Sequence, residues 1–453
     1  MLSRTDDVGS PLVITGSSVL TGSVFHDIVV QNHGSLHIYG NLRGNLTIEP
    51  TASVVVEGFV DGKVTNKGGR LVVNSNEGIA EFVTLAGPPE IEAGGVLGIN
   101  LSAIALNWGA LAKQTLGECA AVVRANAYGC GIDLVAAALA KSGCKTFFVS
   151  DLAEARCVRK AAPKSTIYVL SGLYPGTGPM FAEIGAQPVV SSHIEMAEWD
   201  AFATSSQWTG GFALHVSTGT DRLGIAFEEA AAFAPRIHSA NCGITLLLSD
   251  LDNREKPDQR ANDRRIERFK ELRRLYPSIP ASIAESSSIF SCPQAHFDLV
   301  RSGPLLFGVN PTPGASNPML PVIQLQARIV QVRNLASGDT IDDIGWVAKR
   351  RTRLAMVSIG YADGYPRSGN SGSNKLQAVV AGQRCPVVGN ASIDLLSIDI
   401  TDLPDSRPAR RGEMVTLIGA EISIDDLAAF AQSTASELLI NLGSRFHRIY
   451  HAG

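Results

Sequence analysis

The 453-residue chain lacks a strong charge bias, a cysteine framework and any long apolar run. Its 39 basic and 43 acidic side chains leave a net charge of −4, which argues against nucleic acid or an acidic membrane as the main partner. The seven cysteines include no CxxC pair, so we expect neither a disulfide framework nor a metal site, and a cytoplasmic location. The N-terminal residues lack the apolar core of a signal peptide, and no segment is apolar for long enough to span a bilayer.

The length indicates more than one domain. A chain of 453 residues exceeds what one hydrophobic core usually covers, so two or three domains are expected. Hydrophobic residues make up 45% of the chain, which is typical of globular proteins. Basic and acidic residues alternate at helical spacing between Arg254 and Arg274, which indicates a solvated helix face rather than a binding patch.

Residues 1–77 carry a glycine repeat. Gly22, Gly40 and Gly58 are spaced 18 residues apart, and short alternating strands such as Leu36–Tyr39 lie between them. Turn residues and short strands at a fixed period predict a small β-solenoid, in which each repeat stacks on its neighbours. The segment resembles the bactofilin type of polymer-forming solenoid. A plain β-meander is the alternative.

After an expected linker at residues 78–98, strands and helices alternate. This pattern over residues 99–318 predicts a (β/α)8 TIM barrel, with an open doubly wound sheet as the competing topology. Residues 319–453 are dominated by strand-like runs and predict a separate β-rich C-terminal domain. The fold class is therefore multidomain α/β. The expected barrel strands are Ala121–Arg124, Thr146–Ser150, Ile167–Ser171, Pro188–Ser191, Phe212–Ser217, Ile244–Ser249, Ala281–Glu285 and Asp298–Ser302.

Polar residues follow several of these strands at one end of the predicted barrel. Arg124 ends the first strand and Arg301 the last, while Arg222 and Ser286 follow the fifth and seventh. Catalytic residues of TIM barrels lie at the carboxyl ends of the strands. Arginines and hydroxyl groups gathered there would suit a phosphate or a carboxylate.

Several motifs resemble the alanine racemase family, whose cofactor is pyridoxal phosphate (PLP). The resemblance runs in the family's order from about Ile99 to the end of the chain. One motif departs from the family's pattern, because Arg124 stands at the position of the lysine that binds the cofactor. The motifs are Val123–Gly129 for the cofactor, Arg222–Gly224 and Arg301–Gly303 for the active-site arginines, Ile359–Arg367 for the catalytic tyrosine and Val388–Asp394 for the substrate carboxylate.

The resemblance implies a reaction and a role for each matching residue. The family inverts the α-carbon of an amino acid, interconverting L- and D-alanine, and PLP stabilises the carbanion. Tyr361 matches the catalytic tyrosine, which in the family reaches the partner's barrel in a homodimer. Cofactor contacts are implied for Tyr128, Ser286, Arg301 and Gly303, and substrate contacts for Arg222, Ile393 and Asp394.

Arg124 is where the resemblance breaks down chemically. The family's lysine holds the cofactor as a Schiff base and serves as one of two bases. A guanidinium stays protonated at any ordinary pH, forms no stable Schiff base and is a very poor proton acceptor. General-base catalysis alone contributes about 10² to 10⁴-fold. Leu247 and Ser436 also stand about where the family has a histidine and a tyrosine that support its site.

Three hypotheses follow. The first is an alanine-racemase-like protein without normal racemase activity that binds PLP, or another phosphorylated or anionic small molecule, non-covalently. The second is an active PLP-dependent alanine racemase, supported by the intact Tyr361 motif. The third is a non-enzymatic scaffold that assembles through the N-terminal solenoid, since the open ends of a β-solenoid can stack.

Overall fold

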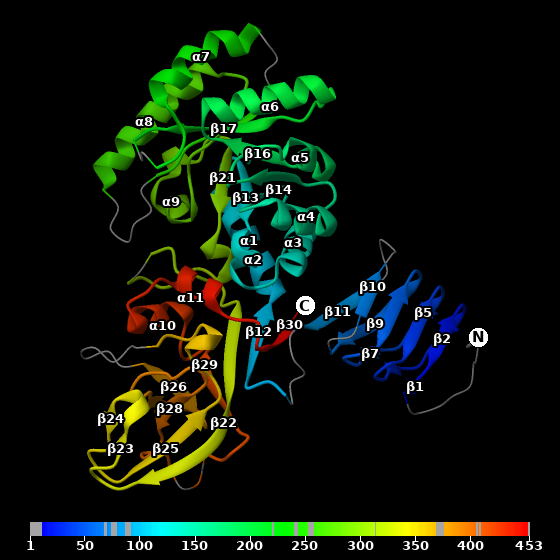
Figure 1. The fold of residues 1–453 in the computed structure, drawn as a ribbon, viewed down its shortest axis with the longest axis vertical. Coiled ribbons are helices and arrows are strands. Elements are labelled where there is room, and N and C mark those ends of the chain that lie inside the picture. The colour runs from blue at the N-terminus through cyan, green and yellow to red at the C-terminus, as the bar shows by residue number, and fades with distance from the viewer. Residues whose placement is uncertain are drawn as a thin grey trace. The chain divides into compact units, whose positions relative to one another are not determined.

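The structure is a computed structural model. It describes residues 11–451 apart from 68–69, 74–78, 87–91, 220–221, 240–242, 252–257, 313, 368–375, 405 and 407–408. The chain divides into two compact units, Met1–Ser102 with Pro321–Gly453, and Ala103–Leu320 (Figure 1). Among the described residues, no helix is both long and apolar enough to cross a membrane.

The N-terminal part of the first unit is a β-solenoid of parallel strands. Residues 18 positions apart pair side by side, as in Ser17 with Ser35 and Ser35 with Ser53. Alternate side chains point inward, so that Leu20 and Ile38 are fully buried in the core. The strands are β1 (Leu12–Ile14), β2 (Ser17–Leu20), β3 (Ser23–Val24), β4 (Ile28–Val30), β5 (Ser35–Ile38), β6 (Asn41–Leu42), β7 (Leu46–Ile48), β8 (Ser53–Val56), β9 (Phe59–Asn66), β10 (Arg70–Val73) and β11 (Ile79–Ala86).

The repeated glycines lie where successive coils approach most closely. A Cβ on Gly40 would overlap the backbone carbonyl of Gly22, and a Cβ on Gly58 would overlap that of Gly40. Another corner is held by a side chain, since the Asn45 N–H donates to Asp27 Oδ1 at 2.7 Å. Glycine at this point of each stacked coil is therefore a steric requirement.

Residues 78–98, expected to be a linker, contain strands. They include β11 and most of β12 (Gly95–Asn100). Strand β11 pairs parallel to β9, and β12 pairs antiparallel to β22 (Ile323–Leu335) of the C-terminal domain. Leu97 and Ile99 of β12 are buried, and this alternation is the sequence signal for the strand.

The C-terminal part of the first unit is β-rich, as predicted. Strand β22 is its longest strand and pairs with β12, β25 and β29. The remaining elements are η3 (Asp342–Ile344), η4 (Tyr361–Asp363), α10 (Ile424–Ala431), α11 (Ala435–Asn441), β23 (Thr340–Ile341), β24 (Trp346–Val347), β25 (Thr352–Val357), β26 (Gln377–Val380), β27 (Gln383–Pro386), β28 (Leu396–Asp399), β29 (Met414–Ile418) and β30 (His447–His451).

The second unit is the predicted parallel barrel. Its main strands follow the order β20-β19-β17-β16-β15-β14-β13-β21. Backbone bonds from Arg301 N–H to Ala284 and from Asp298 N–H to Ala281 join the two ends, so the open-sheet alternative is wrong. The strands are β13 (Glu118–Val122), β14 (Thr146–Val149), β15 (Thr166–Val169), β16 (Gln187–Val190), β17 (Phe212–Ser217), β18 (Ile225–Ala226), β19 (Ile244–Leu248), β20 (Ala281–Ser282) and β21 (Leu299–Ser302).

Helices lie on the outside of the barrel strands (Figure 1). Both faces of a strand such as β14 are therefore buried, which explains its unbroken apolar run instead of an alternation. Side-chain caps begin several helices, and Asp151 accepts from the Glu154 N–H at the start of α4. The helices are α1 (Leu101–Gln114), α2 (Arg124–Tyr128), α3 (Ile132–Lys141), α4 (Leu152–Ala161), α5 (Gly178–Ile184), α6 (His193–Ser206), α7 (Phe227–Ser239), α8 (Gln259–Leu275), α9 (Ser286–Ser291), η1 (Pro293–Ala295) and η2 (Pro304–Phe307).

We predict that Gly40→Ala destabilises the solenoid by about 1–3 kcal/mol, because its methyl group would overlap the preceding coil. Gly22→Ala is the matched control, since no atom of the described residues lies within 4 Å of a Cβ there, and its effect should stay within about 0.5 kcal/mol. Hydrogen exchange of solenoid peptides measures both variants. Equal protection in the two variants would contradict the steric account.

Candidate active site at the barrel mouth

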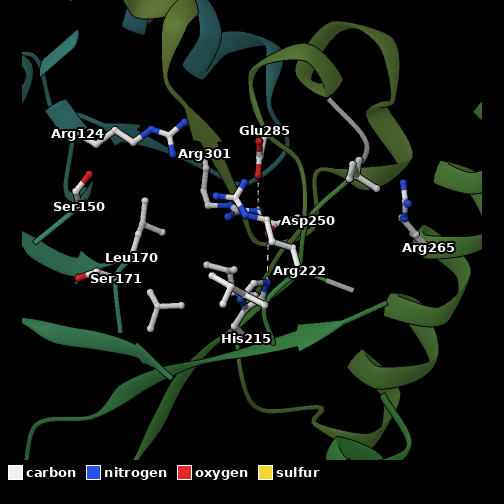
Figure 2. Close-up of a pocket in the computed structure, with 14 residues that line it drawn as sticks. Arg124, Ser150, Leu170, Ser171, His215, Arg222, Asp250, Arg265, Glu285 and Arg301 are labelled. Carbon is white, nitrogen blue, oxygen red and sulfur yellow. Dashed lines mark hydrogen bonds and ion pairs between the residues drawn. The ribbon is translucent and has the colours of Figure 1, made fainter. Parts of the chain in front are cut away.

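A cavity of about 900 Å³ opens at the carboxyl ends of the barrel strands. Its volume is that of a small-molecule site, and its position is where TIM barrels carry their chemistry. Among the residues lining it, Arg124, Arg222 and Arg301 were predicted from strand ends, and the structure brings them together around one cavity. Figure 2 shows Arg124 and Ser150 on one side of this cavity and Arg265 on the other.

Arg124 begins a short left-handed turn, α2, directly after β13. The four residues Ala125, Asn126, Ala127 and Tyr128 have φ angles between 51° and 55°. For residues other than glycine this conformation costs about 1–2 kcal/mol each. Hydrogen bonds offset part of this cost, because the Asn126 N–H donates to Glu154 Oε1 at 2.9 Å.

The left-handed turn carries Tyr128 to a position where three polar groups meet. The Tyr128 hydroxyl would lie 2.6 Å from a Cβ on Gly303, so any larger residue there would require the hydroxyl or the backbone to shift. The Gly303 N–H donates to Ser286 Oγ at 2.8 Å. We call these three groups the cradle: the Tyr128 hydroxyl, Ser286 Oγ and the Gly303 N–H. Two neighbouring hydroxyl groups, one of them held by a backbone N–H, can donate to an anion.

Arg124 is hydrogen-bonded to Tyr128 and so lies beside the cradle. Burial opposes its charge, but the interaction with Tyr128 and the carboxylates of Glu285 and Asp250 outweighs burial and raises the pKa of Arg124. Burial also raises the pKa of Tyr128, so its hydroxyl is neutral at ordinary pH. Arg124 therefore brings a permanent positive charge to this side of the cavity.

Arg301 is the buried centre of a charged cluster. Only 5% of its side chain is exposed, and its Nη2 lies 3.0 Å from Asp250 Oδ1 and 3.4 Å from Glu285 Oε1. The same nitrogen donates to the backbone carbonyl of Ser249. His215 Nε2 lies 3.3 Å from Asp250 Oδ2 on the other side. Figure 2 shows Arg301, Asp250 and Glu285 close together within the cavity.

The residues predicted in the C-terminal domain also come together. Tyr361 and Ala362 donate backbone hydrogen bonds to Ser392 and Ile393, which joins the two motifs. The Tyr361 and Ile393 side chains are 42% and 54% exposed, and Asp394 accepts from Arg445 Nη1 at 2.7 Å. The Tyr361 motif and the Ile393–Asp394 segment therefore form one surface of this domain.

Sequence reasoning misplaced one residue and missed others. Leu247, compared with a supporting histidine, lies between Leu246 and Leu248, which belong to the barrel's inner core. Because side chains alternate along a strand, Leu247 faces away from the cavity. Asp250 lines the cavity instead, and so does Arg265. Asp250 directly follows the strand Ile244–Ser249, so the strand-end rule could have found it.

Ser436 lies in α11 of the C-terminal domain, where the resemblance placed a phosphate-binding tyrosine. The structure describes that domain as a separate unit from the barrel that holds the cradle. Its comparison with a phosphate ligand therefore remains a prediction.

Comparisons with known proteins cover the chain from residue 99 onward. The family model of the alanine racemase N-terminal domain matches residues 99–311, and that of the C-terminal domain matches residues 322–450. An alanine racemase of Methylobacterium sp. (strain 4-46) is 44% identical over 359 residues, which is 79% of this chain and 98% of that protein. A catabolic alanine racemase of Mesorhizobium japonicum is 41% identical over 378 residues, covering 82% and 97%.

Solved structures agree with the sequence comparisons. The alanine racemase of Bartonella henselae, whose crystal structure holds covalently bound pyridoxal phosphate, superposes with a TM-score of 0.74 at 32% identity. The match covers 79% of this chain and all of that one. The biosynthetic alanine racemase of Pseudomonas aeruginosa gives a TM-score of 0.72 at 28% identity, covering 80% and 100%. Since both domain models match in order and close relatives align over almost their whole length, the chain belongs to the alanine racemase family.

Proposed function

We propose that this chain binds PLP, or a similarly phosphorylated small molecule, at the barrel mouth without a covalent bond to the protein, and that it lacks normal alanine racemisation. The observation that carries the proposal is the identity of the basic residues around the cavity. They are Arg124, Arg222, Arg265 and Arg301, and no lysine is among the described residues that line it. An imine bond to the protein requires a primary amine, which a guanidinium does not provide.

The residues of the cradle fit the phosphate group of such a ligand. The Tyr128 and Ser286 hydroxyls would donate to phosphate oxygens, while the Gly303 N–H donates to Ser286 Oγ and holds that hydroxyl in place. The missing Gly303 side chain leaves room for the Tyr128 hydroxyl beside them. Arg124, bonded to Tyr128, would supply an ion pair. The arginine would thus hold the ligand by charge, whereas an amine would hold it by a covalent bond.

PLP, when bound, supplies the electron-withdrawing ring that stabilises a carbanion. The chain's own residues would then do three things. Arg222 would bind the carboxylate of an amino acid, and Tyr361 would exchange a proton at one face of the α-carbon. Arg124 would keep its own proton and leave the opposite face without a base. Inversion of the α-carbon needs both faces, so turnover would be close to absent.

An active alanine racemase is the second candidate. The relatives favour it, since a protein named alanine racemase is 44% identical over 98% of its length. The retained Tyr361 surface and the cavity arginines also support it. Incubation of the purified, PLP-loaded chain with L-alanine separates the two candidates: formation of D-alanine at a rate ordinary for an enzyme would establish this second function and overturn the first.

We predict that Arg124→Lys gains a covalent link to PLP that the wild-type chain lacks, because it restores a primary amine at the end of β13. Borohydride reduction followed by mass measurement of the intact chain should show an added pyridoxyl group in the variant only. Arg265→Lys is the matched control, since it places an amine elsewhere around the same cavity. A reducible adduct on the wild-type chain would contradict the proposal.

We predict that Gly303→Ala weakens PLP binding by about tenfold or more, because its methyl group would displace the Tyr128 hydroxyl from the cradle. A loss of this size corresponds to at least about 1.4 kcal/mol. Gly109→Ala in α1 is a control, since outside its own helix no described residue has an atom within 4 Å of a Cβ there. Equilibrium titration followed by ligand fluorescence measures both. Unchanged affinity in Gly303→Ala would argue against the cradle as the phosphate site.

We further propose a homodimer, with Tyr361 completing the partner's site, and a larger assembly through stacked solenoids. The structure of the outermost coil supports stacking of solenoids. Among the described residues, its strands β1 and β2 pair on one side only, with β4 and β5 respectively. Light scattering after size exclusion should give a dimer or a multiple of it. Removal of the residues before Gly78 should leave the dimer and abolish anything larger. An unchanged mass distribution would contradict solenoid-driven assembly.

A further inference from the structure

Two carboxylates share one arginine nitrogen at the barrel mouth. Arg301 Nη2 lies within 3.4 Å of both Asp250 and Glu285, so the two carboxylates must lie close to each other. Each is partly shielded from water, with 34% and 32% of its side chain exposed. Two negative charges at this separation repel each other, and a shared proton removes the repulsion.

The surrounding charges decide which carboxylate takes the proton. Asp250 is contacted by Arg301 at 3.0 Å and by His215 at 3.3 Å, on separate oxygens. Glu285 has the longer contact to Arg301 and faces Arg124. Arg222 and Arg265 line the same cavity. Asp250 is therefore better compensated, and Glu285 is the carboxyl group that would hold the proton.

The pKa shifts agree with this division. Burial would raise the pKa of Asp250, but Arg301 and His215 outweigh burial and hold it well below its usual range. Burial and the nearby charge of Asp250 raise the pKa of Glu285 to about 7, against the opposing effect of Arg301. At neutral pH, Asp250 is thus ionised, while Glu285 is protonated in part of the molecules.

We propose that Asp250 and Glu285 form one shared protonation site that is partly occupied at neutral pH, and that a dianion bound in the cradle draws a proton from the solvent onto the pair. The inference rests on the proposed binding function and adds that a proton is taken up when the anion binds. Glu285 directly precedes Ser286, whose hydroxyl belongs to the cradle, and it faces Arg124, which bonds the cradle's Tyr128. A dianion there lies close to the Glu285 carboxyl group, and its charge favours the neutral form.

The sign of the linkage gives the pH dependence. The dianion raises the pKa of Glu285 in the complex above its value of about 7 in the free protein. Affinity is therefore highest below about pH 7 and falls as the pH rises, by up to tenfold per pH unit for one proton. The site thus binds a doubly charged anion most tightly when the carboxylate pair also takes up a proton.

Sulfate is the probe for this linkage, because it stays a dianion throughout the neutral and alkaline range and carries no titration of its own. We expect calorimetry near pH 7.5, in two buffers of different ionisation enthalpy, to show uptake of a fraction of a proton up to one proton per sulfate. Glu285→Gln keeps the shape of the side chain but removes its titration, so uptake and pH dependence should both vanish. Glu183→Gln, a substitution of an exposed carboxylate paired with Arg156, is the control that should retain them.

Asp250→Asn is a second variant that tests the repulsion itself. Without the neighbouring charge, the pKa of Glu285 should fall, and the pH range of the linkage should move downward. Sulfate binding without proton uptake in the wild-type chain, or uptake that persists in Glu285→Gln, would overturn the shared proton while leaving the cradle intact. No sulfate binding at any pH, in wild type or Glu285→Gln, would instead count against the cradle and overturn both proposals.

Discussion

The contact between the Arg124 guanidinium and the Tyr128 hydroxyl is the interaction on which the properties of the barrel mouth depend. It places a charge that cannot be titrated beside the Ser286 and Gly303 groups. An amine at the same strand end could lose its proton and form a covalent bond to an aldehyde. The guanidinium stays protonated and can only attract an anion. In the proposed function, the cavity would therefore hold an anion by charge and would form no covalent bond to an aldehyde.

Around Arg301 the balance of charge is the reverse, because two carboxylates contact one guanidinium nitrogen. Arg301 carries one positive charge and contacts two carboxylates, which leaves one negative charge in excess. In the proposed arrangement a proton on the carboxylate pair removes this excess. Arg124 acts on this balance because its charge favours ionised Glu285. A bound dianion would offset that effect. Ligand charge and carboxyl protonation would thus be coupled through residues that come from separate barrel strands.

Local patterns in the sequence predicted much of this arrangement. All eight main barrel strands follow from apolar runs, and Arg124, Arg222 and Arg301 follow from strand ends. The left-handed turn after β13 could not be predicted, because alanine and tyrosine disfavour positive φ and a single asparagine tolerates it without requiring it. The pairing of Asp250 with Arg301 is also invisible locally, since it joins residues 51 positions apart. Residues 95–98, expected to be part of a linker, belong to strand β12, and the sequence nearby gives no sign of this because both partner strands lie in the C-terminal domain.

The left-handed turn also explains how binding could outlast chemistry on this scaffold. Four strained residues are a lasting cost that surrounding hydrogen bonds must offset, so the turn persists only where the rest of the structure fixes it. It orients Tyr128 through the backbone, whatever side chain stands at position 124. Replacement of an amine by a guanidinium there would therefore leave the cradle in place while removing a covalent bond and a base. In the proposed function, loss of turnover with retention of a phosphate site would follow from carrying the two tasks on different atoms.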